Sequence, residues 1–270
     1  MIKLFVTDLD HTLLDDDKDI HPRDRAAIDR LIDSGTEFAI ATGRSEAEFQ
    51  YIVDQLDHPC HRISQNGVYV RTAQGDELAS AILPPLVTKQ IIEEATGYNF
   101  QLYINVAEQT YTPYLSEEAK EYSSKMQLPV IEDRFIVEQL DESVLPCKFC
   151  FIGEKEPLLR FMQQLDHKDY RQHVDLFLSS PYCVDVVPKG ISKGFGVQRL
   201  IDHLGISLSE VACVGDAYND VPMFQIVSNS YAMRHADPGV QKEAVHVVDS
   251  VAEAVKQVLH ENQAKKPTIM

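Results

Sequence analysis

Short apolar runs alternate with amphipathic stretches along both ends of the chain. Helices are predicted at residues 22–34 and 195–204, where apolar positions recur on one side. A capping box of Ser45 and Glu48 begins a further helix. Strands and helices in this order predict a parallel sheet with helices packed on its faces. The buried strands are predicted at residues 2–6, 38–41, 61–64, 211–214, 230–233 and 246–248.

The pattern changes in the middle of the chain. A hairpin is predicted at Asn66-Gly67, and Pro84-Pro85 then interrupts both patterns. Alternation resumes at Pro188. We therefore predict an α/β core from residues 1–83 and 188–270, with an inserted two-layer α+β domain at residues 84–187 that resembles a lid or specificity module. In the insert, helices are predicted at residues 86–95, 116–126 and 156–165, and strands at 100–104, 148–152, 174–179 and 182–187.

Composition and charge limit the classes of partner. The chain has 44% hydrophobic and 25% charged residues, which is typical of a globular protein with a core. Its net charge of −17 argues against nucleic acid and anionic membranes, because both require a basic surface. No apolar run is long enough to span a bilayer, and polar residues 15–19 follow too early for a signal peptide. We therefore expect a cytoplasmic protein; nothing in the sequence indicates its oligomeric state.

The cysteines give no sign of a special site. They are scattered and odd in number, which argues against a disulfide framework. Cys147 and Cys150 match C-x-x-C, the spacing of redox and metal-binding pairs. The residues around them predict a strand, however, where side chains three apart face opposite sides. We therefore expect ordinary strand packing. Between residue 86 and about residue 185 we see no tight cluster of His, Cys or carboxylates that indicates chemistry. The five cysteines are Cys60, Cys147, Cys150, Cys183 and Cys213.

Two carboxylates follow the first predicted strand. Asp8 and Asp10 are two positions apart, so they project from the same face if the backbone stays extended. Carboxylates held this close repel each other and need a cation between them or a shared proton. Mg²⁺ suits such a site, because it commonly binds one or two carboxylates and completes its shell with waters and substrate phosphate. The alternative is an acidic surface turn.

Two further loops offer positive or hydrogen-bonding groups. Thr42, Gly43 and Arg44 form a glycine-containing turn before a helix, where backbone N–H groups and a hydroxyl can bind an anion. The alternative is a plain loop in which Arg44 is a solvated charge. Lys193 is expected in the first turn of a helix, where a cation is unfavourable unless it has an anionic partner. The alternative is a surface lysine, like the nearby Lys189.

A second acidic loop follows the strand at residues 211–214. It carries Asp216, Asn219 and Asp220 ahead of a predicted helix. In an open parallel sheet, ligands bind beyond the carboxyl ends of the strands, near the point where the strand order reverses. We therefore expect the four loops to meet at one edge of the sheet.

These loops together resemble the four ordered motifs of the haloacid-dehalogenase-like superfamily. The insert between the second and third motifs resembles the cap of its Cof-type phosphatases, subclass IIB. The sequence departs from the Cof-type pattern at His11 and Ala217, where glycine is usual, and we expect both residues to change loop shape near the substrate. The matching motifs are Asp8-Leu-Asp10-His-Thr12-Leu-Leu, Ala41-Thr42-Gly43-Arg44, Ser192-Lys193-Gly194 and Gly215-Asp216-Ala-Tyr-Asn219-Asp220.

The resemblance implies a Rossmann-like core and Mg²⁺-dependent hydrolysis of a small phosphorylated metabolite, with sugar phosphates as the expected class. Asp8 would attack phosphorus to give an aspartyl-phosphate, and Asp10 would act as acid and then as base. Mg²⁺ would be held by Asp8, the main-chain carbonyl of Asp10, and Asp216. The groups expected to bind phosphate or substrate are the Leu9 N–H, Thr42, Gly43, Arg44, Lys193 and Asn219, with Asp220 steadying Lys193 or a metal-bound water.

Three other functions share part of this pattern. A phospho-accepting receiver domain uses Asp, Lys and Thr at strand ends, but it is about half this length and takes phosphate on a mid-chain strand. A phosphohexomutase of the same superfamily would share the core and return the phosphoryl group to an intermediate. A non-catalytic phospholigand sensor would not need Asp8, Asp10, Lys193 and Asp216 all intact.

Overall fold

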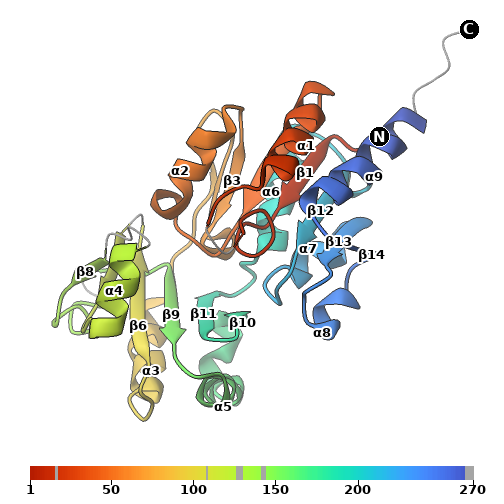
Figure 1. Ribbon diagram of the computed structural model, residues 1–270. Helices are drawn as coiled ribbons and strands as arrows, with labels where there is room; N and C mark the ends of the chain where they lie inside the picture. The colour runs from red at the N-terminus through yellow and green to blue at the C-terminus, as the bar shows by residue number, and fades with distance from the viewer. Residues whose placement is uncertain (16–17, 108, 126–129, 141–143, 265–270) are drawn as a thin grey trace, which may run out of the picture. The chain divides into compact units, whose positions relative to one another are not determined.

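The computed structural model describes residues 1–15, 18–107, 109–125, 130–140 and 144–264. Two units are distinguished by their internal contacts. We call Met1–Ser80 with Ser192–Met270 the core unit, and Ala81–Ile191 the inserted unit. Figure 1 shows both, with the chain coloured from its N-terminus to its C-terminus.

An eight-stranded sheet forms the centre of the core unit, in the order β14-β13-β12-β1-β2-β3-β4-β5. Neighbouring strands from β14 to β3 are parallel, and β4 and β5 add an antiparallel edge. The strands are β1 (Leu4–Thr7), β2 (Glu37–Ala41), β3 (His61–Ser64), β4 (Tyr69–Arg71), β5 (Glu77–Ala79), β12 (Val211–Gly215), β13 (Asn229–Met233) and β14 (His246–Val248).

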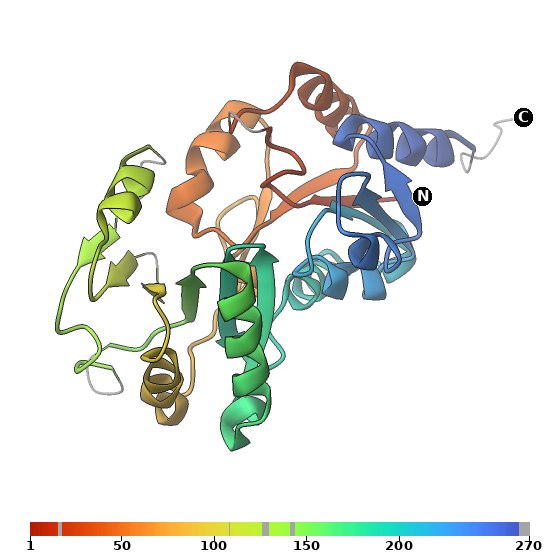
Figure 2. The same ribbon diagram turned by 60° about the horizontal axis from the view of Figure 1, so that its bottom comes forward.

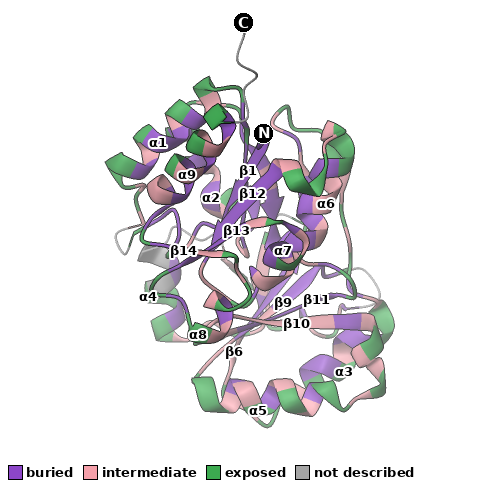
Figure 3. Cartoon of the chain, turned by 90° about the vertical axis from the view of Figure 1, so that its right-hand side faces the viewer, coloured by how far each residue is buried: buried purple, intermediate pink, exposed green. Residues whose placement is uncertain are grey.

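Helices cover both faces of this sheet because side chains alternate along each strand. Phe5 of β1 packs into the cluster formed with α1, α2 and α9. Leu4 and Val6 point the other way, into the cluster formed with α6 and α7. Figure 3 shows the central strands buried and the outer sides of α1 and α9 exposed. The helices are α1 (Pro22–Asp33), α2 (Glu46–Leu56), α6 (Lys193–Leu204), α7 (Val221–Ile226), α8 (Pro238–Gln241) and α9 (Val251–Ala264), with short 3₁₀ turns η1 (Gln65–Gly67) and η3 (Leu208–Glu210).

The strand order reverses between β1 and β12. From β1 the chain adds β2 and β3 on one side, and after the insert it adds β12, β13 and β14 on the other. The two strands are parallel and in register from Leu4 opposite Val211 to Thr7 opposite Val214, so their carboxyl ends lie side by side. A ligand site is expected at such a reversal.

The inserted unit has a sheet in the order β10-β11-β9-β6-β7-β8. Its pairs are antiparallel except for β7 with β8. Helices α3 and α5 lie next to each other and share one apolar cluster with Phe149, Phe151, Val184 and Val186 (Figure 2). The elements are α3 (Pro85–Ala95), β6 (Gln101–Val106), β7 (Gln109–Thr112), α4 (Glu117–Lys125), β8 (Val130–Glu132), β9 (Lys148–Ile152), α5 (Lys155–Asp166), η2 (Asp169–His173), β10 (Val174–Ser180) and β11 (Cys183–Pro188).

The α/β class, the parallel core and the α+β insert are confirmed. The strand predicted at residues 148–152 has those bounds, and so does the strand at 61–64. The hairpin at Asn66-Gly67 is also confirmed, although its turn is the 3₁₀ segment η1. The short strands β7 and β8 were not predicted, and Met126, the last residue of one predicted helix, lies outside the described residues. None of the described helices combines the length and the apolar character needed to cross a membrane.

Candidate active site

Asp8 lies at the point where the strand order reverses. Strand β1 ends at Thr7, and the Asp8 N–H donates to the carbonyl of Val214 on β12 at 2.8 Å. Side-chain alternation continues through this residue, which puts Asp8 on the same face as Leu4 and Val6, toward α6. The carboxylate is therefore buried beside the first residue of that helix.

Lys193 begins α6 and binds two carboxylates. Ser192 caps the helix by accepting a hydrogen bond from the Phe195 N–H. The Lys193 Nζ lies 2.5 Å from Asp8 Oδ1 and 2.6 Å from Asp220 Oδ1. The side chain is only 1% exposed. The anionic partners that its unfavourable position required are thus both present.

Asp220 organises the second acidic loop. Its Oδ1 accepts from Lys193, and its Oδ2 accepts from the N–H groups of Asp216 and Ala217, both at 2.9 Å. Both oxygens are therefore engaged in holding the lysine and the loop. Asp216 is held in turn by Thr12, whose hydroxyl donates to Asp216 Oδ1 at 3.0 Å.

The charges of this group do not balance within the protein. Asp8, Asp216 and Asp220 have carboxylate oxygens within 4.8 Å of one another, and Lys193 supplies one ammonium. Burial raises the pKa of Asp8 well above its usual value; the charge of Lys193 opposes this rise, and the neighbouring Asp220 and Asp216 add to it. Burial and Asp220 also raise the pKa of Asp216. Burial alone would lower the pKa of Lys193, but the two carboxylates raise it, so the lysine stays charged.

A divalent cation fits this group. Three ionised carboxylates and one ammonium leave two negative charges, which one divalent ion neutralises. The donor atoms are oxygens only, the type that Mg²⁺ prefers. Because Asp220 is already engaged through both oxygens, Asp8 and Asp216 are the carboxylates that would hold the ion.

Asp10 lies outside this carboxylate group and binds Arg44 instead. Arg44 Nε contacts Asp10 Oδ2 at 2.8 Å and its Nη2 contacts Oδ1 at 2.6 Å, while Lys18 Nζ reaches Oδ1 at 3.0 Å. Burial opposes ionisation of Asp10, but the hydrogen bond and charge of Arg44 outweigh it and lower its pKa to about 2. The two carboxylates predicted to act together thus bind different cations in this structure.

Three other predicted residues lie in the loops that follow β2 and β1: Thr42, Gly43 and Leu9. The Thr42 hydroxyl, at the end of β2, accepts from the Arg44 N–H at 3.2 Å, and Gly43 lies between them. Leu9 is buried in the core, and its carbonyl accepts from the N–H groups of Leu13 and Leu14. These contacts fix the conformation of both loops.

Asn219 is held from the β3–β4 hairpin. Its Nδ2 donates to Asn66 Oδ1 at 3.0 Å, while its own Oδ1 is buried without a hydrogen-bond partner. Asn66 has a φ of 59°, in the left-handed region. The adjacent Gly67 has a φ of +96°, and a Cβ there would lie 2.1 Å from the Ser192 carbonyl oxygen. The hairpin therefore supports both Asn219 and the start of α6.

The sequence analysis missed three residues of this site. Asn66 was explained by its turn, although it also binds Asn219. Thr12 was quoted within a motif but given no role, and it binds Asp216. His235 was not noticed; its Nε2 lies 3.8 Å from Asp216 Oδ2. Of the three, only Thr12 could have been found from the sequence, because it follows Asp8 and Asp10 at the same two-residue spacing.

Comparison with known proteins agrees with this geometry. The model of the haloacid dehalogenase-like hydrolases matches residues 5–259. The chain belongs to this family. It is accordingly an enzyme of the phosphatase and phosphotransferase superfamily, which confirms the resemblance seen in its four motifs.

Individual relatives cover nearly the whole chain. The HMP-PP phosphatase of Escherichia fergusonii is 28% identical over 251 residues, which cover 92% of this chain and 89% of that protein. A haloacid dehalogenase-like hydrolase from Bacteroides thetaiotaomicron has the same fold, with a TM-score of 0.80, 24% identity, and coverage of 96% of this chain and 100% of that one. The HAD subclass IIB sugar phosphatase BT4131 also has this fold, with a TM-score of 0.81, 19% identity, and coverage of 96% and 99%.

Proposed function

We propose that this chain is a Mg²⁺-dependent phosphatase that hydrolyses small phosphorylated metabolites through an aspartyl-phosphate on Asp8. The observation that carries the proposal is the buried group of Asp8, Asp216 and Asp220 around Lys193, at the reversal of the strand order. Sugar phosphates are the substrate class we expect first. The soluble phosphate esters of this class carry the negative charge that such a cation-containing site attracts.

Asp8 is the nucleophile in this proposal. Its carboxylate oxygen forms a bond to phosphorus while the bond from phosphorus to the ester oxygen breaks, which leaves an acyl phosphate on Asp8 and an alkoxide leaving group. Water then attacks the same phosphorus and releases inorganic phosphate, regenerating the Asp8 carboxylate. Dividing hydrolysis between two steps in this way is the usual benefit of covalent catalysis.

Asp10 is the general acid and then the general base in this proposal. It gives a proton to the departing ester oxygen in the first step and takes one from the attacking water in the second. The contacts with Arg44 and Lys18 favour the ionised form, which suits the second step. In the first step Asp10 must carry a proton, which it delivers to the leaving group from the orientation that Arg44 fixes.

Positive charge offsets the repulsion between Asp8 and a phosphate dianion. Mg²⁺ bound by Asp8, Asp216 and the main-chain carbonyl of Asp10 would neutralise charge on the phosphate and orient it. Lys193 uses two of its three N–H donors on Asp8 and Asp220, and we assign the third to a phosphate oxygen. The other groups assigned to the phosphate are the Thr42 hydroxyl, the N–H groups of Gly43 and Leu9, and the Asn219 amide.

The decisive experiment combines phosphate release with trapping of the intermediate. Wild-type protein should release phosphate from an aryl phosphate, EDTA should stop the release, and Mg²⁺ should restore it. Asp8→Asn should lower kcat by about 10³-fold or more while circular dichroism stays unchanged. Rapid acid quench with a ³²P-labelled substrate should yield labelled wild-type protein and unlabelled Asp8→Asn protein. Turnover by Asp8→Asn near the wild-type rate would remove Asp8 from the nucleophile role.

A metabolite panel separates the substrate classes. Hexose 1- and 6-phosphates test the sugar-phosphate class, and HMP-PP tests the substrate named for the Escherichia relative. Product analysis distinguishes hydrolysis from mutase activity, since a phosphohexomutase converts one hexose phosphate into the other without net phosphate release. A phospholigand sensor would bind members of the panel without consuming them.

A further inference from the structure

Alternation along two neighbouring strands of the inserted unit brings three metal-binding side chains to one face of its sheet. On β9, Phe149 and Phe151 enter the cluster with α3 and α5, so Cys150 between them faces the opposite side. On β11, Val184 and Val186 enter the same cluster, so Cys183 and Asp185 also face the opposite side.

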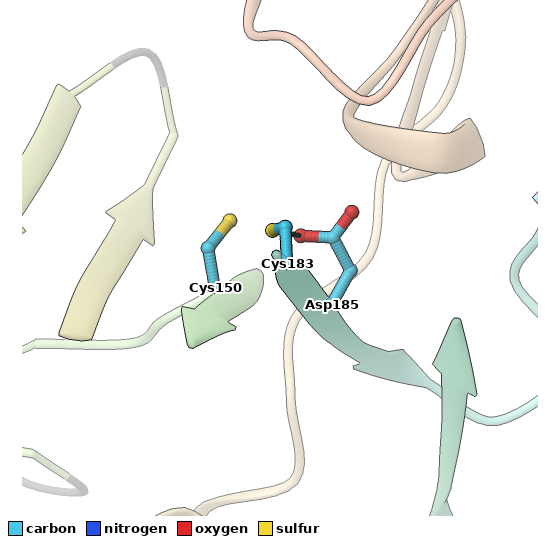
Figure 4. A group of neighbouring side chains, drawn as sticks. All are labelled: Cys150, Cys183 and Asp185. Atoms are coloured by element: carbon cyan, nitrogen blue, oxygen red, sulfur yellow. Dashed lines mark hydrogen bonds between the residues drawn. The ribbon is translucent and has the colours of Figure 1, made fainter. Parts of the chain in front are cut away.

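The three side chains converge. Asp185 pairs directly with Cys150 across the ladder, and Cys183 lies two residues before Asp185. The two sulfur atoms and a carboxylate oxygen lie within 4.8 Å of one another. The Cys183 thiol donates to Asp185 Oδ1 at 3.8 Å, and Figure 4 shows the sulfur of Cys150 directed toward this pair. The expectation that the stretch from residue 86 to about residue 185 holds no such cluster was wrong, because strand pairing joins residues 33 or more positions apart in the chain.

We propose that Cys150, Cys183 and Asp185 form a binding site for a zinc-class divalent cation, separate from the Mg²⁺ site proposed in the core unit. Two thiolates and one carboxylate are ligands that Zn²⁺ accepts and Mg²⁺ does not select. A tetrahedral zinc ion lies about 2.3 Å from sulfur, which sets its ligands roughly 3.5 to 4 Å apart. The observed ligand atoms, which lie within 4.8 Å of one another, are close to that spacing.

The charge of the surroundings matches a divalent ion. Two thiolates and a carboxylate around such an ion leave one negative charge. Lys148, on the same face of β9, places its Nζ 3.6 Å from Asp185 Oδ1, and both side chains are buried. Its ammonium balances the charge that remains, so the loaded site is neutral. The fourth coordination position is left for water or a small ligand.

The strand register disfavours a disulfide between Cys150 and Cys183. Cys183 stands opposite Ile152, so it is a diagonal neighbour of Cys150 across the ladder. Diagonal neighbours have Cα atoms about 7–8 Å apart, whereas a disulfide usually needs less than about 7 Å. Both cysteines are free thiols in the structure.

Cobalt substitution tests the site without using activity. The full-length protein, reduced and freed of metal by a chelator, is titrated with Co²⁺ and monitored for the thiolate-to-cobalt charge-transfer band in the near ultraviolet. We expect a band that saturates at one equivalent and that Zn²⁺ abolishes while Mg²⁺ leaves it unchanged. Oxygen ligands alone give no such band, so Co²⁺ bound to the carboxylates of the proposed Mg²⁺ site does not contribute to the signal.

Variants identify the ligands. Cys150→Ala and Cys183→Ala should each remove about half of the band and weaken Co²⁺ binding, and Lys148→Met should weaken binding by about tenfold or more. Cys147→Ala is the matched control: Cys147 also carries a thiol next to β9, but it lies outside the group of three ligands and its thiol donates to the Asn105 main-chain carbonyl, so the band should persist.

Thiol reactivity gives a second readout on wild-type protein. Zn²⁺ should protect two thiols from a disulfide reagent, and unfolding should expose them again. The proposal is overturned if Co²⁺ gives no band, if Cys150→Ala and Cys183→Ala keep the full band, or if aerated metal-free protein loses two thiols that a reductant restores. The last outcome would show a redox pair instead of a metal site.

Discussion

Arg44 holds Asp10 through two parallel contacts, Nε to Oδ2 at 2.8 Å and Nη2 to Oδ1 at 2.6 Å. Such a bidentate pair fixes the plane of the carboxylate as well as its charge. Arg44 was predicted to bind phosphate or substrate; in this structure its guanidinium binds the Asp10 carboxylate. We therefore propose that Arg44 positions the group that we assign to proton transfer.

Removing Arg44 should slow the enzyme most on substrates with poor leaving groups. Arg44→Met frees the Asp10 carboxylate from its fixed orientation, and an alkoxide depends more on a well-placed acid than an aryl oxide does. We expect kcat/KM to fall by about tenfold or more for alkyl phosphates and by much less for aryl phosphates. Steady-state kinetics on the two substrate classes checks this.

Lys18→Met is the matched control for Arg44. Lys18 makes a single contact with Asp10 at 3.0 Å, and its side chain is more exposed than that of Arg44. It should change both substrate classes by about the same small factor. An equal loss on alkyl and aryl phosphates in Arg44→Met would show that Arg44 does not act through Asp10.

Replacing Lys193 should destabilise the fold as well as stop catalysis. Lys193→Met leaves Asp8 and Asp220 buried without their ammonium, and breaking a buried pair in this way costs about 3–5 kcal/mol. Urea unfolding measures the loss. Lys189→Met is the control: Lys189 is exposed, and its ion pair with Asp175 should be worth about 1 kcal/mol or less. Similar losses in the two variants would contradict the central role of Lys193.

The sequence was most informative at positions where the residue type has a single physical explanation. Lys193 in the first turn of a helix required an anionic partner, and the structure provides two. The capping box of Ser45 and Glu48 is present as predicted. In both cases the signal itself lies at the start of one helix, although the two carboxylates that bind Lys193 are 185 and 27 residues away in the chain.

Cross-strand neighbours could not be read from the sequence. Asp10 seemed to belong with Asp8, but in the structure it binds Arg44 and Lys18 from other parts of the chain. Cys150 was expected to pack as an ordinary strand residue, but the strand register places it beside Asp185 and Cys183 of β11. Such neighbours depend on strand order and register, which the hydrophobic pattern of one sequence does not specify.

Mg²⁺ should raise the melting temperature, and the rise should depend on Asp216. An ion that binds only the folded state stabilises it by mass action. Asp216→Asn removes one of the two proposed carboxylate ligands, so most of the Mg²⁺-dependent rise should disappear. The control Asp202→Asn changes an acid on α6 that pairs with Arg199, and it should keep the full response. Thermal melts with EDTA and with excess Mg²⁺ measure the rise in melting temperature of each protein. If Asp216→Asn shows the same rise as wild type, Asp216 is excluded as a ligand.

Gly215 should not tolerate a side chain. A Cβ at this position would lie 2.4 Å from the Cγ atom of Asp220, so the carboxylate that holds Lys193 and the acidic loop would be displaced. Gly215→Ala should lower both activity and the free energy of unfolding. Gly97→Ala is the control, because a Cβ there meets nothing within 4 Å. Activity assays and urea unfolding check both variants; a fully active Gly215→Ala would show that Asp220 is not essential in its observed position.

Asp175 should make the stability of the inserted unit depend on pH. Its carboxylate accepts from Lys189 Nζ at 2.6 Å, the Gly190 N–H at 2.7 Å and Arg171 Nη1 at 3.2 Å. Burial alone would raise the pKa of Asp175, but these partners outweigh it and lower the pKa below the usual value. The stabilisation is therefore complete above the unfolded pKa of about 3.9 and is lost as the pH falls through the lower folded pKa.

Asp175→Asn should accordingly lower the melting temperature by roughly 2–4 °C at pH 7, and the difference from wild type should shrink below about pH 4. Thermal melts of both proteins from pH 7 down to pH 3 measure the trend. Asp169→Asn, a change at an exposed acid of η2, should leave the melting temperature unchanged across the series. A difference that stays constant with pH would mean that Asp175 stabilises the unit by packing, because a contribution from its charge must vanish once the carboxylate is protonated.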